Sequence, residues 1–134
     1  MDQFRLNAVA DKWQWVWRYW RSLTYDELEE RPWTPFVLNG ELCFTARENG
    51  KWFVVVGHSN GKKYDDVFDT VEYQSKPLYV ARENSEWLLV LGNNESQRFT
   101  QQINFKIHNG EVLIKLYISA ENSVQLVKPF WTEN

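Results

Sequence analysis

The sequence predicts a mostly β (α+β) protein: an antiparallel β-meander of tandem repeats with an N-terminal aromatic amphipathic helix packed on it. Three observations lead to this fold class. The 134 residues suit one domain, 1–134. Residues 1–35 carry a helical spacing of apolar side chains, and residues 36–134 carry short β-rich runs that repeat. Aromatic residues make up 16% of the chain, which excludes intrinsic disorder.

The N-terminal segment has its apolar residues three and four positions apart between Leu6 and Leu23. This spacing predicts an amphipathic helix over residues 3–22. Trp13 and Trp20 lie on its apolar face, which we expect to cover one face of the sheet region.

A second, shorter helix is expected just after the first. Thr24 and Glu27 have the spacing of a capping box, in which each side chain binds a backbone N–H at the start of a helix. The pattern predicts a short helix over residues 25–30, and Pro32 ends it.

The rest of the chain repeats itself every 35 residues. An Ala-Arg-Glu-Asn motif followed by Trp52 recurs 35 positions later, followed by Trp87, and Gly57 recurs as Gly92. The Asn-Gly-Glu-Leu sequence at 39–42 returns as Asn-Gly-Glu-Val at 109–112, two periods on. Self-similarity of this kind indicates about two and a half repeats over residues 39–128.

Each repeat is predicted to be a meander of antiparallel strands. Asn49-Gly50 is a residue pair that tight hairpins favour, because both residues tolerate positive φ. Alternation and turn residues predict these strands: 41–47, 51–57, 62–68, 70–74, 77–82, 86–91, 97–100, 103–107, 111–118 and 124–128.

The unit from Gly40 to Val67 resembles the repeats of bacterial WG-repeat and TolB-like, propeller-type proteins. The resemblance rests on the Trp-Phe-Val-Val run, the glycine that follows it and the Gly-Lys-x-Tyr-Asp-x-Val stretch. It implies that each unit is a small antiparallel sheet and that the protein binds other proteins. Two and a half units are too few to close a propeller, so a small barrel, a sandwich and a partial propeller all stay open.

Charge and hydropathy exclude several partners. The net charge is −3 and no segment is strongly basic, so duplex nucleic acid is not an expected ligand. No apolar run approaches the 18 residues that predict a membrane-spanning helix, and the N-terminus lacks the pattern of a signal peptide. A single cysteine excludes a disulfide framework within the chain, and a cytoplasmic location is expected.

Few residues have the pattern of a catalytic or metal site. His58 and His108 are expected in surface turns, and Cys43 is expected to be a buried strand residue, since none has a partner at catalytic or ligand spacing. Asp65, Asp66 and Asp69 could act as paired carboxylates in an enzyme, but a solvated turn is the favoured interpretation. No phosphate-binding, nucleophile or zinc-protease motif occurs, so no enzyme activity, cofactor or metal is expected.

The expected function is protein–protein interaction, either with a partner or within a homo-oligomer. The interface candidates are Trp15, Arg18, Tyr19 and Trp33, because Trp, Tyr and Arg are the residues that interfaces use most. A small acidic inhibitor of a bacterial enzyme or defence complex is one form of this function. The alternative is a β-barrel whose Trp-lined pocket binds a small molecule or a sugar.

Overall fold

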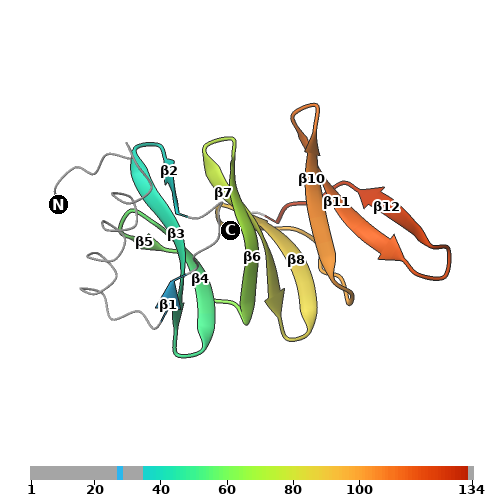
Figure 1. The fold of residues 1–134 in the computed structure, drawn as a ribbon, viewed down its shortest axis with the longest axis horizontal. Helices are drawn as coiled ribbons and strands as arrows, with labels where there is room; N and C mark the ends of the chain where they lie inside the picture. Colours follow the sequence, from blue (N-terminus) through green and yellow to red (C-terminus); the bar gives the residue numbers. More distant parts are fainter. Residues whose placement is uncertain (1–26, 29–34, 133–134) are drawn as a thin grey trace.

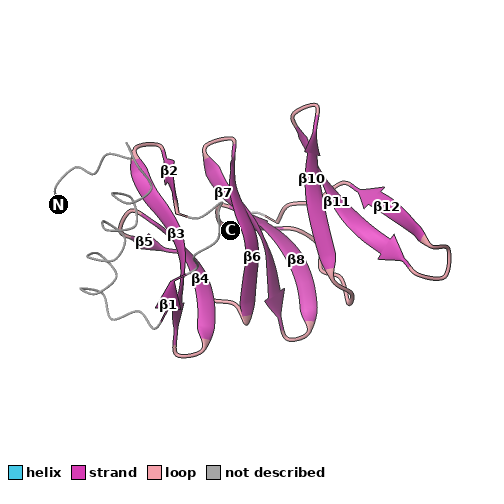
Figure 2. Ribbon diagram, viewed as in Figure 1, coloured by secondary structure: helices cyan, strands magenta, loops and turns pink. Residues whose placement is uncertain are grey.

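The chain is all β over the part that the structure describes. The computed structural model describes residues 27–28 and 35–132, and these form three small antiparallel sheets without a helix (Figure 2). The strands form separate sheets instead of closing into one barrel. Along the chain, the sheets follow one another in a row (Figure 1).

Sheet 1 is built around β3 (Glu41–Glu48), which pairs with three other strands. β1 (Glu27–Leu28) and β2 (Phe36–Leu38) pair with one edge of it, and β4 (Lys51–Val56) pairs with the other. The short β5 (Ser59–Asn60) then pairs with β4.

Sheet 2 is a four-stranded meander. Its strands, in order, are β6 (Asp66–Tyr73), β7 (Lys76–Glu83), β8 (Glu86–Leu91) and β9 (Asn94–Glu95). The register of β6 and β7 shifts between Phe68 and Val71, where Asp69 has a φ of 57°. This shift is typical of a β-bulge.

Sheet 3 has only three strands, β10 (Ile103–His108), β11 (Glu111–Ile118) and β12 (Ser123–Val127). Strands β3, β7 and β11 begin at residues 41, 76 and 111, which are 35 residues apart. The predicted 35-residue period is therefore the spacing of the sheets along the chain.

The tight turns follow from residue types that accept a left-handed backbone. Asn49 and Gly50 have φ of 53° and 78°, and Asn84 and Ser85 have φ of 55° and 68°. Two consecutive positive φ values define the turn that matches the twist of a two-residue hairpin. The second copy keeps this turn although a serine replaces the glycine.

The three sheets pack face to face through two apolar layers. In sheets 1 and 2, we call the face toward the following sheet the front face and the opposite one the back face. In sheet 3, the front face is the one that holds the equivalent positions of the repeat. Cys43 and Val54 of the front face of sheet 1 pack on Tyr79, Ala81 and Leu88 of sheet 2. The second layer is formed by Leu78, Val80, Leu89, Leu91, Ile103, Val112, Ile114 and Leu116, between sheets 2 and 3.

Polar contacts also join the sheets. The hydroxyl groups of Thr45 and Thr70 lie 3.3 Å apart within the first layer, and the Tyr73 hydroxyl donates to the carbonyl oxygen of Gly110 at 2.6 Å. Burial of aromatic and branched side chains supplies most of the stability of such a stack.

The back face of sheet 1 is buried as well. Its side chains at Leu42, Phe44 and Phe53 are almost fully inaccessible. The sequence predicts that an aromatic helix over residues 3–22 covers one face of the sheet region. That helix lies outside the described residues.

The predicted helix over residues 25–30 is wrong where the structure describes it. Glu27 and Leu28 form β1, which pairs antiparallel with Arg47 and Ala46 of β3. The capping-box spacing is a local pattern, and a place at the edge of a sheet outweighs it because the edge strand gains backbone hydrogen bonds.

Three of the predicted strands are also wrong. The segments 62–68 and 70–74 are not two strands: β6 starts at Asp66 and continues to Tyr73. The segment 97–100 forms only an isolated bridge, between Phe99 and Trp87. The remaining predicted strands agree with the structure to within about two residues at each end.

Candidate interaction surface

The front face of sheet 3 is exposed, whereas the same face of sheets 1 and 2 is covered by the next sheet. Tyr117, Val124 and Leu126 stand on this face with 54%, 59% and 45% of their surface exposed. Tyr117 and Val124 are direct cross-strand neighbours, and Leu126 lies opposite Lys115. Together, Lys115, Tyr117, Val124 and Leu126 form what we call the terminal face.

The equivalent faces of sheets 1 and 2 show what packs on this surface in the other repeats. Leu126 lies opposite residue 115 of β11, as Leu89 lies opposite residue 80 of β7, so the two leucines hold the same place. Leu89 is fully buried under sheet 3, but no further sheet of the described residues packs on Leu126. The terminal face thus occupies the position of a stacking surface and is left open.

One local difference separates the third copy from the first two. The hairpin of sheet 2 turns over two residues, Asn84 and Ser85, whereas the hairpin of sheet 3 turns over the four residues 119–122. Because of the two extra residues, Val124 takes the place of Trp52 and Trp87. An alignment at a constant 35-residue offset misses this correspondence.

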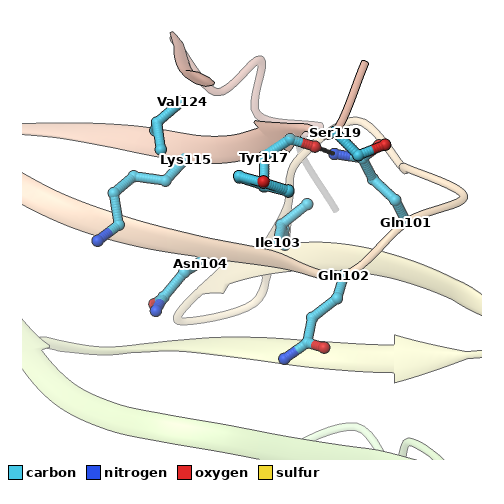
Figure 3. A pocket seen from close by; sticks show the side chains of 8 residues that line it. All are labelled: Gln101, Gln102, Ile103, Asn104, Lys115, Tyr117, Ser119 and Val124. Atoms are coloured by element: carbon cyan, nitrogen blue, oxygen red, sulfur yellow. Dashed lines mark hydrogen bonds between the residues drawn. The ribbon is translucent and has the colours of Figure 1, made fainter. Parts of the chain in front are cut away.

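A hollow of about 540 Å³ adjoins the terminal face. Gln101 and Gln102 precede β10, and Lys115 and Tyr117 come from β11 (Figure 3). The amide of Gln101 donates to the carbonyl oxygen of Tyr117 at 3.2 Å, which holds the start of β10 beside the end of β11. The wall therefore combines an aromatic ring, a lysine and several amides.

A group of charged residues lies where sheets 1 and 2 meet. Lys62 lies 3.2 Å from Glu83 and 3.0 Å from Glu95, and Arg98 lies 2.8 Å from Glu83 and 3.3 Å from Glu95. The Tyr64 hydroxyl donates to Glu95 at 2.6 Å. We call these five residues the junction cluster.

The junction cluster keeps its carboxylates ionised. Burial works against ionisation of Glu95, but hydrogen bonds from Tyr64 and Lys62 outweigh it and lower the pKa of this carboxyl group. The pKa of Glu83 is lowered in the same way, by Arg98 and Lys62 against the effect of burial. The ion pairs and hydrogen bonds that lower these pKa values also link residues of sheets 1 and 2, so the cluster can serve as a structural junction.

Two of the acidic candidates from the sequence, Asp65 and Asp66, have different ion-pair partners in the structure. Asp65 pairs with Lys51 and accepts a 2.9 Å hydrogen bond from the backbone N–H of Asn84. The hydrogen bond from Lys51 is the main reason why the pKa of Asp65 is lowered. Asp66 lies 3.8 Å from Arg82. Within residues 27–28 and 35–132, no group of three or more potential ligands could hold a metal ion.

The cysteine and the histidines lie where the sequence places them. Cys43 is completely buried in the layer between sheets 1 and 2, and burial raises the pKa of its thiol to about 12. A thiol with so high a pKa is not a nucleophile at neutral pH. His58 and His108 are exposed beside turns.

The predicted interface residues Trp15, Arg18, Tyr19 and Trp33 lie outside the described residues. Sequence reasoning missed Tyr117, Val124 and Leu126, because it counted the third copy as only half a repeat. The signal that would have identified these residues is the pairing register of β11 and β12. Once the longer 119–122 turn is allowed for, apolar side chains fall on positions that are covered in the other two copies.

Comparison with known proteins gives no further guide: no family model, no curated protein and no solved structure matches this chain. No helix in the described part of the chain is long and apolar enough to span a membrane.

Proposed function

We propose that the protein is a non-catalytic protein–protein interaction module that binds its partner on the terminal face. One observation carries the proposal: a surface that stacks against the next sheet in two repeats is exposed in the third, with Tyr117, Val124 and Leu126 standing on it. Exposed apolar clusters of this kind mark interaction sites. Tyrosine is one of the residue types that are enriched in binding hot spots.

The expected partner is a protein that presents an apolar surface. In the two covered copies, the front face meets the apolar back face of another sheet. The resemblance to WG-repeat proteins supports the same view, and we take the three sheets to be blades of an open, propeller-type array. An enzyme that is inhibited by this acidic chain is one partner of this class.

The first test of the proposed function uses the Tyr117→Lys variant. Tyr117 is more than half exposed, so we expect the fold to survive, and a charge in place of its aromatic ring should weaken partner binding about 10-fold or more. Immobilised wild type and variant are compared for the proteins they capture from the source cells. Each captured protein is then purified and its affinity measured by calorimetry.

The matched control is Val37→Lys, which puts the same charge at an exposed apolar residue on the opposite end of the molecule. Val37→Lys should capture the same proteins as wild type. If every partner binds Tyr117→Lys as tightly as wild type, the terminal face is not the binding site.

The second candidate function is sugar binding in the hollow beside Tyr117. An aromatic ring flanked by the amides of Gln101, Gln102 and Asn104 can stack on a sugar and bind its hydroxyl groups. Titration of a sugar panel, followed by NMR shifts of these amides, tests it. No shift at near-millimolar sugar would exclude this function.

A further inference from the structure

The outer edge of β12 lacks a strand that both other sheets possess. In sheet 1, β4 is followed by β5 and by a bridge from Trp52 to Tyr64, and in sheet 2, β8 is followed by β9 and by a bridge from Trp87 to Phe99. β12 is the last strand of sheet 3, and none of the described residues pairs with its outer edge (Figure 1). An unpaired edge of this kind is a template for a further strand.

The other two sheets show which backbone groups of β12 point outward. Trp52 exchanges two backbone hydrogen bonds of 2.8 Å with Tyr64, and Trp87 exchanges bonds of 2.7 and 2.8 Å with Phe99. Val124 holds the place of these tryptophans. Because hydrogen-bonding direction alternates along an antiparallel strand, the N–H and C=O groups of Val124 and Leu126 face the open edge, and those of Gln125 face β11.

The sequence of β12 is complementary to itself. It reads Ser-Val-Gln-Leu-Val, with no charge and no proline to prevent pairing. In an antiparallel pair centred on Gln125, Val124 of one copy lies opposite Leu126 of the other. Both residues have outward backbone groups, so each such pair can exchange two hydrogen bonds and also bring two apolar side chains together.

The flanking charges favour the same register. Lys128 follows the strand directly, and Glu121 lies in the turn before it. In the self-paired arrangement, Lys128 of one copy comes beside the turn that carries Glu121 of the other. Lys128 also lies 3.2 Å from Glu111 of its own chain, so Glu121 of the second copy adds a further attraction for Lys128 at each end of the pair.

We propose that a second copy of this chain binds at the open edge, with two β12 strands pairing antiparallel about Gln125. The two three-stranded sheets then become one sheet of six strands. This inference differs from the proposed function in the residues that test it. It rests on the backbone edge of β12 and on the pairing of Val124 with Leu126, two residues that the terminal face also contains, whereas the partner site is tested at Tyr117 on the neighbouring strand β11.

The experiment is sedimentation equilibrium from low micromolar to near-millimolar concentration. The mass of wild type should rise with concentration from 16.1 kDa toward twice that value. Gln125→Lys and Gln125→Glu each place two like charges opposite one another at the centre of the dimer. Each variant alone should weaken the dimer about two- to fivefold, and an equimolar mixture of the two should restore it.

Two further variants complete the test. Gln102→Lys makes the same change of charge at an exposed glutamine outside β12 and should dimerise like wild type. Leu126→Pro removes one outward N–H and should abolish the dimer while the circular dichroism spectrum stays that of a folded sheet.

A wild-type mass of 16.1 kDa at every concentration would overturn the inference, as would a dimer that Gln125→Lys and Leu126→Pro leave unchanged. Either result leaves the proposed function standing, because that function is judged by the Tyr117→Lys variant. Conversely, a dimer with the expected response to the variants supports the inference even when no foreign partner is found.

Discussion

At the scale of the residue, Gly57 and Gly92 occupy positions whose backbone conformation favours glycine. Both have a φ of 61°, and they donate 2.8 Å hydrogen bonds to the carbonyl oxygens of Leu42 and Pro77. Side chains with a Cβ rarely adopt this conformation, because the Cβ comes too close to the carbonyl oxygen that follows it. The recurrence of glycine at a 35-residue interval therefore indicates that the same left-handed turn recurs in the first two repeats.

The Gly92→Ala variant should destabilise the fold by about 1–2 kcal/mol, because alanine must adopt a positive φ. A Cβ at this position also comes within 3.3 Å of the Lys76 side chain, whose flexible end can move. Urea denaturation measures the loss. Asparagine tolerates positive φ, so Gly92→Asn should cost less; equal losses in the two variants would show that φ is not the cause.

At the scale of the strand, the sequence could not show where the chain leaves one sheet for the next. Tyr64 exchanges backbone hydrogen bonds with Trp52 in sheet 1, while the N–H of Asp65, the next residue, donates to Arg82 in sheet 2. Apolar residues stand on both sides of this crossing, Tyr64 before it and Val67 and Phe68 after it, and nothing in the sequence marks the change of sheet. For this reason the pattern over 62–74 predicted the wrong strand limits.

The junction cluster should make the stability of the fold depend on pH where the chain passes from sheet 1 to sheet 2. Hydrogen bonds and cations hold the folded-state pKa of Glu95 below its ordinary value of 4.5. The stabilisation is therefore fully present above about that pH, and it is lost as the pH falls through the lower folded-state value. At pH 7, Glu95→Gln should cost about 1 kcal/mol, since the cluster is partly exposed.

Thermal melts of wild type and Glu95→Gln between pH 7 and pH 3 check this prediction. The difference in melting temperature should be largest at pH 7 and should shrink in acid. Glu72→Gln, at an exposed strand position, is the control and should melt with wild type at pH 7. A difference that is constant over the whole range would contradict the assignment of the acid sensitivity to Glu95.

At the scale of the molecule, the C-terminal segment ties sheet 3 back to sheet 2. After β12, the N–H of Phe130 donates to the Gln97 side chain at 2.7 Å, and the N–H and hydroxyl of Thr132 donate to the carbonyl oxygen of Glu95 at 2.7 and 2.8 Å. Trp131 packs on the apolar layer between the two sheets. The last described residue, Thr132, thus forms a bridge with an earlier repeat, at Glu95.

Trp131→Ala should lower the free energy of unfolding by about 2–3 kcal/mol. This loss is at or just below the usual range for a large aromatic residue, because Trp131 is only half-buried. Its neighbour Phe130 is 72% exposed, so Phe130→Ala should change stability by less than about 0.5 kcal/mol. Both values come from chemical denaturation. Equal effects of the two substitutions would argue that the segment does not hold the sheets together.

The sequence by itself determined the period, the hairpin turns and the antiparallel meander. These features depend on neighbours along the chain: residues such as Asn49-Gly50 and Gly92 accept the left-handed backbone that the turns require. The burial of Cys43 was predictable for the same reason, since it lies in the middle of an apolar strand.

Only the tertiary structure decided which faces are covered, and therefore which one is open. Leu89 and Leu126 have the same side chain at the same place in their sheets, yet one is buried and the other is exposed, because a third sheet follows the second and the described residues form no fourth sheet. Burial depends on what packs on a face, and that information lies in distant parts of the chain.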